Sequence, residues 1–267
     1  MRTVSETTLR ALSRTPLVLI HGFTDSPRTW DLVRPALEQQ HDVLTPALVG
    51  HAGGPPLGDR KVTRDLLPDA LEQAMDDAGI ETAHIVGHSL GGYFALHLAA
   101  RGRARSVVAL APAGGWAKGD DSYKETLRFF PELQQQVKQV APHVDRYLQT
   151  PEGKRRATLF TTVNYEHIPA ELLAHQTRAV ADCEGTVPMT EYAMREGYDL
   201  DAEKITCPVR MVWGTEDKLL PWPKAAVRYR EDWLPNAEYV VLDDVGHSPQ
   251  LDVPLETAQL ILGFTQP

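Results

Sequence analysis

The amino-acid sequence predicts an α/β fold with a mostly parallel central sheet that carries helices on both faces. Short, almost wholly apolar runs alternate with longer stretches of helical periodicity, and this alternation is typical of parallel strands buried on both faces. The chain has 267 residues, enough for one large domain with a sizeable core. Hydrophobic residues make up 42% of it and charged residues 24%, which is ordinary for a globular protein.

Six apolar runs are expected to form the strands of this sheet. They span residues 17–20, 43–48, 84–86, 106–111, 209–213 and 239–242. Helical stretches are expected between or after them, at residues 29–40, 62–78, 90–100, 224–233 and 255–264. Each of these stretches follows a loop or begins beside a Pro, Asp or Ser, residues that favour helix entry.

The alternation breaks between residues 114 and 204. This segment is rich in Gln, Glu, Arg and aromatic residues and lacks strand-like apolar runs, while amphipathic stretches at 125–140, 142–150 and 170–181 predict helices. We therefore expect a helical cap, or lid, at 114–204, inserted into a core formed by residues 1–113 and 205–267. A second independent domain is the alternative, but so few large aliphatic residues would give it a thin core.

Composition also bears on partners and location. The formal net charge of −9 disfavours nucleic acid, because an acidic surface repels phosphates. The first 14 residues carry charges and no apolar core, unlike a signal peptide, and no window of 18 apolar residues exists. We expect a cytoplasmic protein without a membrane span. The two cysteines are too few for a disulfide framework and are expected to be free thiols.

A candidate nucleophile lies between a predicted strand and a predicted helix. Residues 87–92 read Gly-His-Ser-Leu-Gly-Gly, and a G-x-S-x-G motif in the order strand, tight turn, helix is typical of a nucleophile elbow. The bare pattern also arises by chance, so the context carries the prediction. Gly87 and Gly91 leave room for the sharp turn, and Ser89 would stand at a helix N-terminus, where backbone N–H groups face developing negative charge.

A serine hydroxyl needs a base, and the chain offers 10 histidines. His21, His51 and His247 stand beside glycines on loops that follow strands. His247 is favoured because it follows the last strand, and Ser, Asp, His is the chain order expected of such an elbow. His88 lies next to the central strand, where structural work is expected, although it is also a candidate for substrate contact.

An acid should orient this histidine, and the loop after the strand at 209–213 supplies two candidates. Asp217 is favoured over Glu216, because the shorter acid suits a loop that must turn inward towards the imidazole. Asp243 and Asp244 are alternatives. They lie so close to His247 in sequence that they would not orient it easily.

These pieces together resemble the α/β-hydrolase superfamily. His21-Gly22-Phe23, residues 50–53 (Gly-His-Ala-Gly), the elbow, residues 214–217 (Gly-Thr-Glu-Asp) and Gly246-His247 occur in its order and spacing over nearly the whole chain. The chain is most similar to small serine esterases with a helical cap. Such proteins usually have two strands before the His-Gly strand, whereas only 16 residues precede Leu17 here. At most one short edge strand fits, at residues 7–12.

The resemblance implies further roles. The backbone N–H groups of Phe23 and Leu90 would form an oxyanion hole, and the segment 114–204 would cover the active site. Aromatic candidates for an acyl pocket follow by the same analogy, although they could equally form the core of the lid. They are Trp116, Tyr123, Phe129, Phe130, Tyr165 and Trp222.

The expected activity is cleavage of a carboxylic ester of a small molecule through an acyl-enzyme, without metal or cofactor, by a monomer or homodimer. Epoxide and haloalkane hydrolases place an aspartate where Ser89 stands, which disfavours that branch. Other reactions on the same scaffold remain alternatives: carbon–carbon bond hydrolysis, a lyase reaction, perhydrolysis or acyl transfer. A non-catalytic protein that binds a small molecule is a further alternative.

Overall fold

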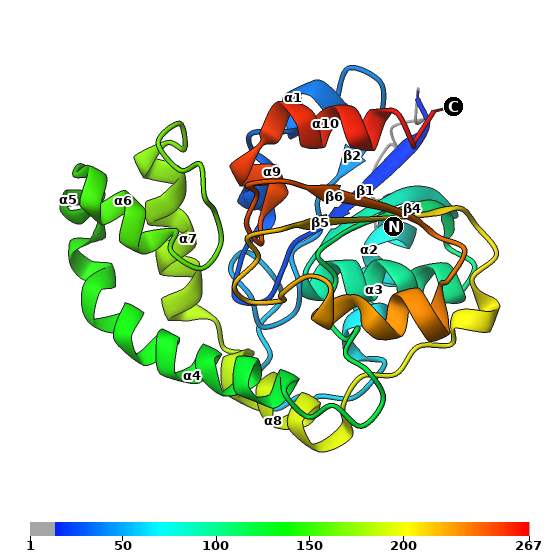
Figure 1. The fold of residues 1–267 in the computed structure, drawn as a ribbon, viewed down its shortest axis with the longest axis horizontal. Coiled ribbons are helices and arrows are strands. Elements are labelled where there is room, and N and C mark those ends of the chain that lie inside the picture. Colours follow the sequence, from blue (N-terminus) through cyan, green and yellow to red (C-terminus); the bar gives the residue numbers. More distant parts are fainter. Residues whose placement is uncertain (1–13, 267) are drawn as a thin grey trace, which may run out of the picture.

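The computed structural model describes residues 14–266, so the edge strand considered at 7–12 lies outside it. Six parallel strands form one sheet in the order β2-β1-β3-β4-β5-β6 (Figure 1). The strands are β1 (Pro16–Ile20), β2 (Asp42–Leu44), β3 (Ala83–His88), β4 (Ala104–Leu110), β5 (Val209–Gly214) and β6 (Glu238–Leu242). The predicted fold class is therefore confirmed.

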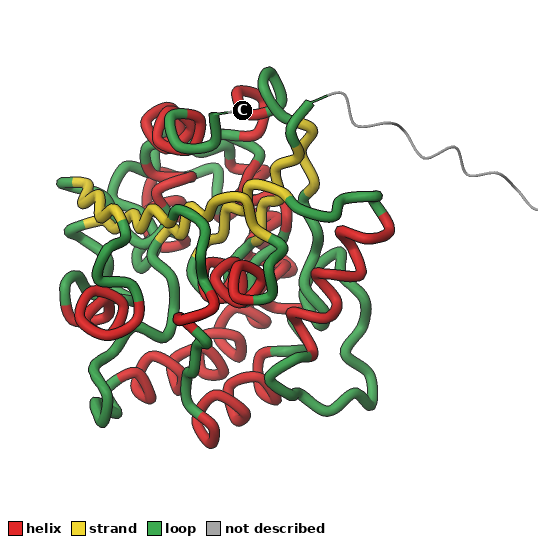
Figure 2. Tube along the Cα trace, turned by 90° about the vertical axis from the view of Figure 1, so that its right-hand side faces the viewer, coloured by secondary structure: helices red, strands yellow, loops and turns green. Residues whose placement is uncertain are grey.

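Successive strand residues point to opposite faces of the sheet, and both faces are buried. Leu17 and Leu19 of β1 belong to one core cluster, which packs against α1 (Arg34–Leu37) and α10 (Pro254–Leu262). Val18 and Ile20 belong to the other cluster, which packs against α2 (Leu66–Asp77) and α3 (Leu90–Ala100). Figure 2 shows the resulting helical layers on the two sides of the sheet.

A helical segment joins β4 to β5. It contains α4 (Tyr123–Val140), η2 (Ala141–His143), α5 (Val144–Tyr147), α6 (Pro151–Ala157), α7 (Ala170–Asp182) and α8 (Thr186–Glu196), and no strand is described between residues 111 and 208. In Figure 1 it forms an arm beside the sheet, with α4 as its longest member. We call residues 123–196 the α4–α8 segment.

Several element boundaries differ from the sequence-based expectations. The helix expected at 29–40 is broken into η1 (Pro27–Trp30) and α1, because Pro35 has no N–H for the preceding turn. The strand expected at 43–48 ends at Leu44, two residues before Pro46. The helix expected at 224–233 is divided into η4 (Lys224–Ala226) and the π-helical η5 (Tyr229–Trp233).

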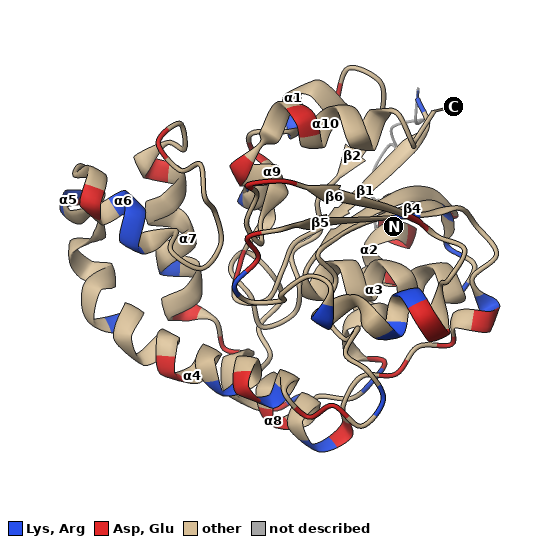
Figure 3. Cartoon of the chain, in the orientation of Figure 1, with Lys and Arg blue, Asp and Glu red and all other residues tan. Residues whose placement is uncertain are grey.

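Four elements between residues 14 and 266 were not predicted from the hydrophobic periodicity of the sequence. They are α6, α8, α9 (Pro249–Asp252) and the 3₁₀ turn η3 (Ala202–Lys204). Three of them are too short to show a helical repeat. None of the helices between residues 14 and 266 combines the length and hydropathy needed to cross a bilayer. Charges of both signs are interspersed along the chain in Figure 3, and both cysteines are free thiols.

Candidate active site

Ser89 sits at a strained turn between β3 and α3. Its backbone angles are φ 53° and ψ −117°, in a region that L-residues seldom adopt. A Cβ on Gly87 would lie 2.2 Å from the carbonyl oxygen of Gly91, and a Cβ on Gly91 would lie 2.3 Å from that of Ile20. Only glycine fits at both positions, which explains the motif and presents the Ser89 hydroxyl at the carboxyl edge of the sheet.

The candidate acid Asp217 and the candidate base His247 contact each other. The Nδ1 atom of His247 lies 2.7 Å from the Oδ2 atom of Asp217, and both side chains are almost fully buried. The other carboxylate oxygen accepts hydrogen bonds from the backbone N–H groups of Leu219 and Leu220, at 2.9 and 2.7 Å. Since the carboxylate accepts a hydrogen bond from the Nδ1–H group, the Nε2 atom of His247 is left without a proton in the neutral ring.

The other acids considered for this role lie elsewhere. Glu216 is exposed on the same loop as Asp217, and Asp243 and Asp244 are exposed beyond β6. The neighbouring loop histidines are enclosed and poorly basic. Burial lowers the pKa of His21 to about 3 and that of His51 to about 4.

His88 contacts the candidate base His247. Its Nε2–H donates to the backbone carbonyl of His247 at 3.0 Å, and the two imidazole rings lie 4.8 Å apart. Burial, followed by the nearby His247, holds the pKa of His88 well below its usual value. The ring is therefore neutral, which its donated hydrogen bond and unpartnered Nδ1 atom also fit. His88 thus contacts the loop of His247 directly, and His247 and Ser89 line the same two cavities.

A buried carboxylate that the sequence analysis missed fixes the loop of His247. Asp252 accepts backbone hydrogen bonds from Gly246 at 2.6 Å and from Val163 and Asn164 at 2.9 and 2.7 Å, and a fourth from the Asn164 side chain at 2.9 Å. It thereby joins the His247 loop to the connection between α6 and α7. An acid within the otherwise mostly apolar stretch 249–254 was the only signal in the sequence.

Two candidate oxyanion donors come from residues that line a cavity together with Ser89. Neither the N–H of Phe23 nor that of Leu90 has a hydrogen-bond partner within residues 14–266. Leu90 is the first residue of α3, where helix geometry leaves N–H groups unpaired. A Cβ on Gly22 would lie 3.0 Å from the Nδ1 atom of His88, so glycine lets the Phe23 loop approach the elbow. This arrangement fits an oxyanion hole.

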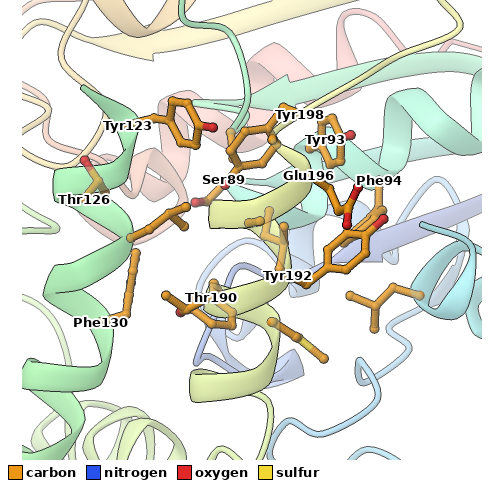
Figure 4. Close-up of a pocket in the computed structure, with 18 of the residues that line it drawn as sticks. Ser89, Tyr93, Phe94, Tyr123, Thr126, Phe130, Thr190, Tyr192, Glu196 and Tyr198 are labelled. Atoms are coloured by element: carbon orange, nitrogen blue, oxygen red, sulfur yellow. The ribbon is translucent and has the colours of Figure 1, made fainter. Parts of the chain in front are cut away.

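Ser89, His247 and Phe23 line two cavities. The first, of about 270 Å³, lies between α3, α4, α8 and the loop at 62–67. Figure 4 shows Ser89 at this cavity, with Tyr123, Thr126 and Phe130 on one side and Thr190, Tyr192 and Glu196 on the other. The second, of about 450 Å³, lies between the His247 loop, α4, α5 and α7.

The predicted lining residues divide between these cavities. Trp116 and Tyr123 line the first, Phe129 and His88 line the second, and Phe130 lines both.

Tyr165 and Trp222 line neither cavity. Tyr165 packs against a small apolar cluster that includes Leu172 and Leu173 of α7. Trp222 packs against Trp213 and Tyr239, and its ring centroid lies 5.9 and 6.4 Å from theirs. Both rings are partly buried against other side chains, so neither cavity supports a place for them in an acyl pocket.

Comparisons with known proteins agree with this geometry. The model of the alpha/beta hydrolase family matches residues 17–260. Epoxide hydrolase EphH of Mycobacterium tuberculosis is 32% identical over 208 residues, which cover 75% of this chain and 94% of that protein. The pimeloyl-(acyl-carrier protein) methyl ester esterase of Aromatoleum aromaticum is 30% identical over 265 residues, covering 94% of this chain and 98% of that protein.

A solved structure shares the fold. A thermophilic esterase from Thermogutta terrifontis superposes with a TM-score of 0.66 at 21% identity, covering 93% of this chain and 88% of that one. The six-stranded parallel sheet and the strained elbow agree with the match of the family model over most of the sequence. The chain therefore belongs to the α/β-hydrolase family.

Proposed function

We propose that the protein is a serine hydrolase that cleaves a carboxylic ester of a small molecule through an acyl-enzyme. The observation that carries the proposal is the buried hydrogen bond between His247 and Asp217 beside a serine held at positive φ. Ester hydrolysis of this kind requires no metal ion or cofactor. Each bond change needs only a nucleophile, a base and donors to the oxyanion.

The proposed steps are those of a serine, histidine and aspartate acting together. The Ser89 oxygen attacks the ester carbonyl while its proton passes to the Nε2 atom of His247. The N–H groups of Phe23 and Leu90 stabilise the resulting oxyanion. The imidazolium, paired with Asp217, returns the proton to the departing alcohol. Water, activated by the same imidazole, then releases the carboxylic acid and restores Ser89.

The α4–α8 segment supports the further proposal that residues 114–204 act as a cap. Its residues make up most of the lining of the second cavity and about a third of the lining of the first. In this assignment, residues up to 113 and from 205 onward carry the chemistry, and the cap shapes the space for a small acyl substrate.

Epoxide hydrolysis is a second candidate, favoured by the similarity to a protein named an epoxide hydrolase. A carboxylate nucleophile that opens an epoxide leaves an ester, which water can hydrolyse. Serine in the same role would leave an ether, which water does not cleave under these conditions. Ser89 therefore favours the ester reaction. Styrene oxide tests the alternative, since steady diol formation would displace our proposal.

The decisive test replaces Ser89 with alanine. We expect Ser89→Ala to abolish hydrolysis of p-nitrophenyl acetate while its urea unfolding midpoint stays near that of the original protein. A fluorophosphonate should label Ser89, as located by peptide mass spectrometry. Ser106→Ala, at another buried serine on β4, is the matched control and should keep both turnover and labelling. Undiminished turnover in Ser89→Ala would refute the proposal.

A further inference from the structure

The second cavity has a long aliphatic wall. Leu133, Val137 and Val140 recur every three or four residues along α4, so that they share one face of the helix. Leu148, Leu173 and Leu251 line the same cavity from other elements, and each is at least nine-tenths buried. Branched aliphatic side chains on both walls suit a flexible apolar group.

This cavity runs from the candidate nucleophile to the surface. Phe130 marks the inner end, where its ring packs 4.9 Å from that of Phe23. Val140, Tyr147 and Phe160 mark the outer end, with exposed fractions of 45, 36 and 38%. Figure 1 shows α4 running from the side of the sheet out to the end of the arm. Residues from Phe129 to Val140 of this helix line the cavity, so the cavity follows the helix.

Two charged side chains line this path, and Gln136, Gln176 and Thr177 add uncharged polar groups along it. Asp25 lies on the loop that follows the candidate oxyanion residue Phe23, and Arg156 is an exposed side chain paired with Glu152 at 2.6 Å. Between them the wall offers mainly apolar atoms. An aliphatic chain of a ligand has no hydrogen-bonding groups, so moving it from water into this cavity breaks no hydrogen bonds. The burial of its apolar surface is favourable.

The first cavity differs in chemistry. Aromatic rings from Trp116, Tyr123 and Tyr198 line it together with the charged Arg64 and Glu196. Aromatic edges and a few polar groups suit a compact or ring-shaped group. The two cavities thus offer different surroundings to the two sides of an ester held at Ser89.

We propose that the second cavity binds the unbranched aliphatic acyl chain of the substrate, and that the first receives the alcohol part. This inference rests on the proposed ester hydrolysis and names its substrate class. Phe130 and Val140 are ten residues apart on α4, which spans about 15 Å at the rise of an α-helix. An extended chain covers roughly 1.2 Å per bond, so about twelve carbons would reach the rim.

A series of p-nitrophenyl esters tests the assignment on the unmodified protein. From acetate to dodecanoate, kcat/KM should rise by about two- to four-fold per added methylene until the chain reaches the rim. Branched esters of equal carbon number should be poorer substrates than the linear ones. A maximum at acetate or butyrate, followed by a steady fall, would overturn the inference.

A blocking substitution tests the place of the chain. Val137→Trp should lower the ratio of decanoate to acetate kcat/KM by on the order of 100-fold, since several methylenes would lose their burial. Gln135→Trp, on an exposed face of the same helix, should leave the ratio unchanged. Val140→Asp at the exposed rim avoids any folding defect and should lower only the rates of the longest esters. An unaltered decanoate-to-acetate ratio in Val137→Trp, together with an unaltered dodecanoate rate in Val140→Asp, contradicts the assignment.

The two proposals fail in different ways. If p-nitrophenyl acetate is hydrolysed and Ser89 is labelled, but the length of the acyl chain has no effect on kcat/KM, the proposed ester hydrolysis is retained. The proposed acyl cavity is then refuted. If no ester is cleaved, calorimetry with decanoate ion still tests the cavity. Binding that is tighter than that of butyrate and lost in Val137→Trp supports an aliphatic site, and equal weak binding of both acids refutes it.

Discussion

The sheet with its flanking helices and the α4–α8 segment use apolar residues in different ways. All residues of β1 and β3 are buried, whereas only Leu127 and Gln134 are buried among the 18 residues of α4. Among residues 14–266, six of the eight exposed large hydrophobic residues lie in the α4–α8 segment: Val140, Tyr147, Leu159, Phe160, Val163 and Val187. The sheet's apolar residues stabilise the fold, while many of the segment's apolar residues line a cavity.

This difference between the sheet and the α4–α8 segment predicts different effects of substitutions in the two regions. Substitutions at the sheet edge should affect the chemical step or stability. Substitutions on the inner face of α4 should affect which substrates bind. Four predictions test this contrast, beginning with the largest effect.

Asp217→Asn should lower kcat by on the order of 10⁴, because an amide facing the Nδ1 atom favours the wrong imidazole tautomer. Steady-state kinetics with p-nitrophenyl acetate measure this loss. Glu216→Gln on the same loop is the matched control and should keep nearly the full rate, because that side chain is exposed. A near-normal rate for Asp217→Asn would mean that another residue orients His247.

Ile85→Ala in the central strand should cost about 2–5 kcal/mol of unfolding free energy, because this fully buried side chain would leave a cavity. Val137→Ala on the cavity face of α4 should cost less than about 1 kcal/mol, because that side chain is only partly buried. Urea denaturation of both variants gives the two values. Equal losses would show that the contrast between sheet and segment is wrong.

Asp252→Ala should lower the free energy of unfolding by about 3 kcal/mol, since it leaves four N–H donors without their acceptor. It also removes the contact between the His247 loop and the connection from α6 to α7. It should also reduce kcat, because the loop of His247 loses its anchor at Gly246. Denaturation and esterase kinetics report the two effects. Glu256→Ala, an exposed acid on α10, should change stability by less than about 0.5 kcal/mol. A stable but slow Asp252→Ala would assign this residue to positioning alone.

The smallest expected effect concerns Asp25, which faces Gln176 of α7 at the second cavity, 3.4 Å from its amide nitrogen. Burial raises the pKa of Asp25 from 3.8 to about 6. Because the folded-state pKa is the higher one, its stabilising contribution is complete below about pH 4 and is lost as pH rises through 6.

Asp25→Asn removes this titration. The variant should be more stable than the original protein at pH 8 by at most about 2 kcal/mol, since the cavity leaves the carboxylate partly hydrated. The difference should shrink towards zero as pH falls to 4. Urea midpoints at several pH values measure it. A gap that does not vary with pH would mean that Asp25 is not held in an apolar environment.

Much of the sheet and part of the candidate site could be predicted from the sequence. Each strand is a short run of apolar residues, and the turn at Ser89 requires glycine at 87 and 91, so both leave local signals. The pairing of Asp217 with His247 followed from chain order, because the carboxyl ends of parallel strands share one edge. Proline positions could have corrected the lengths expected at 29–40 and 43–48.

Only the tertiary structure decided the rest. The four bonds of Asp252 and the support of His247 by His88 join residues between 6 and 159 positions apart, and no local pattern records such partners. The same holds for the two cavities, because helices of similar amphipathic pattern can face a core or an open space. Sequence periodicity reports that a face is apolar, whereas packing decides whether protein or a ligand covers it.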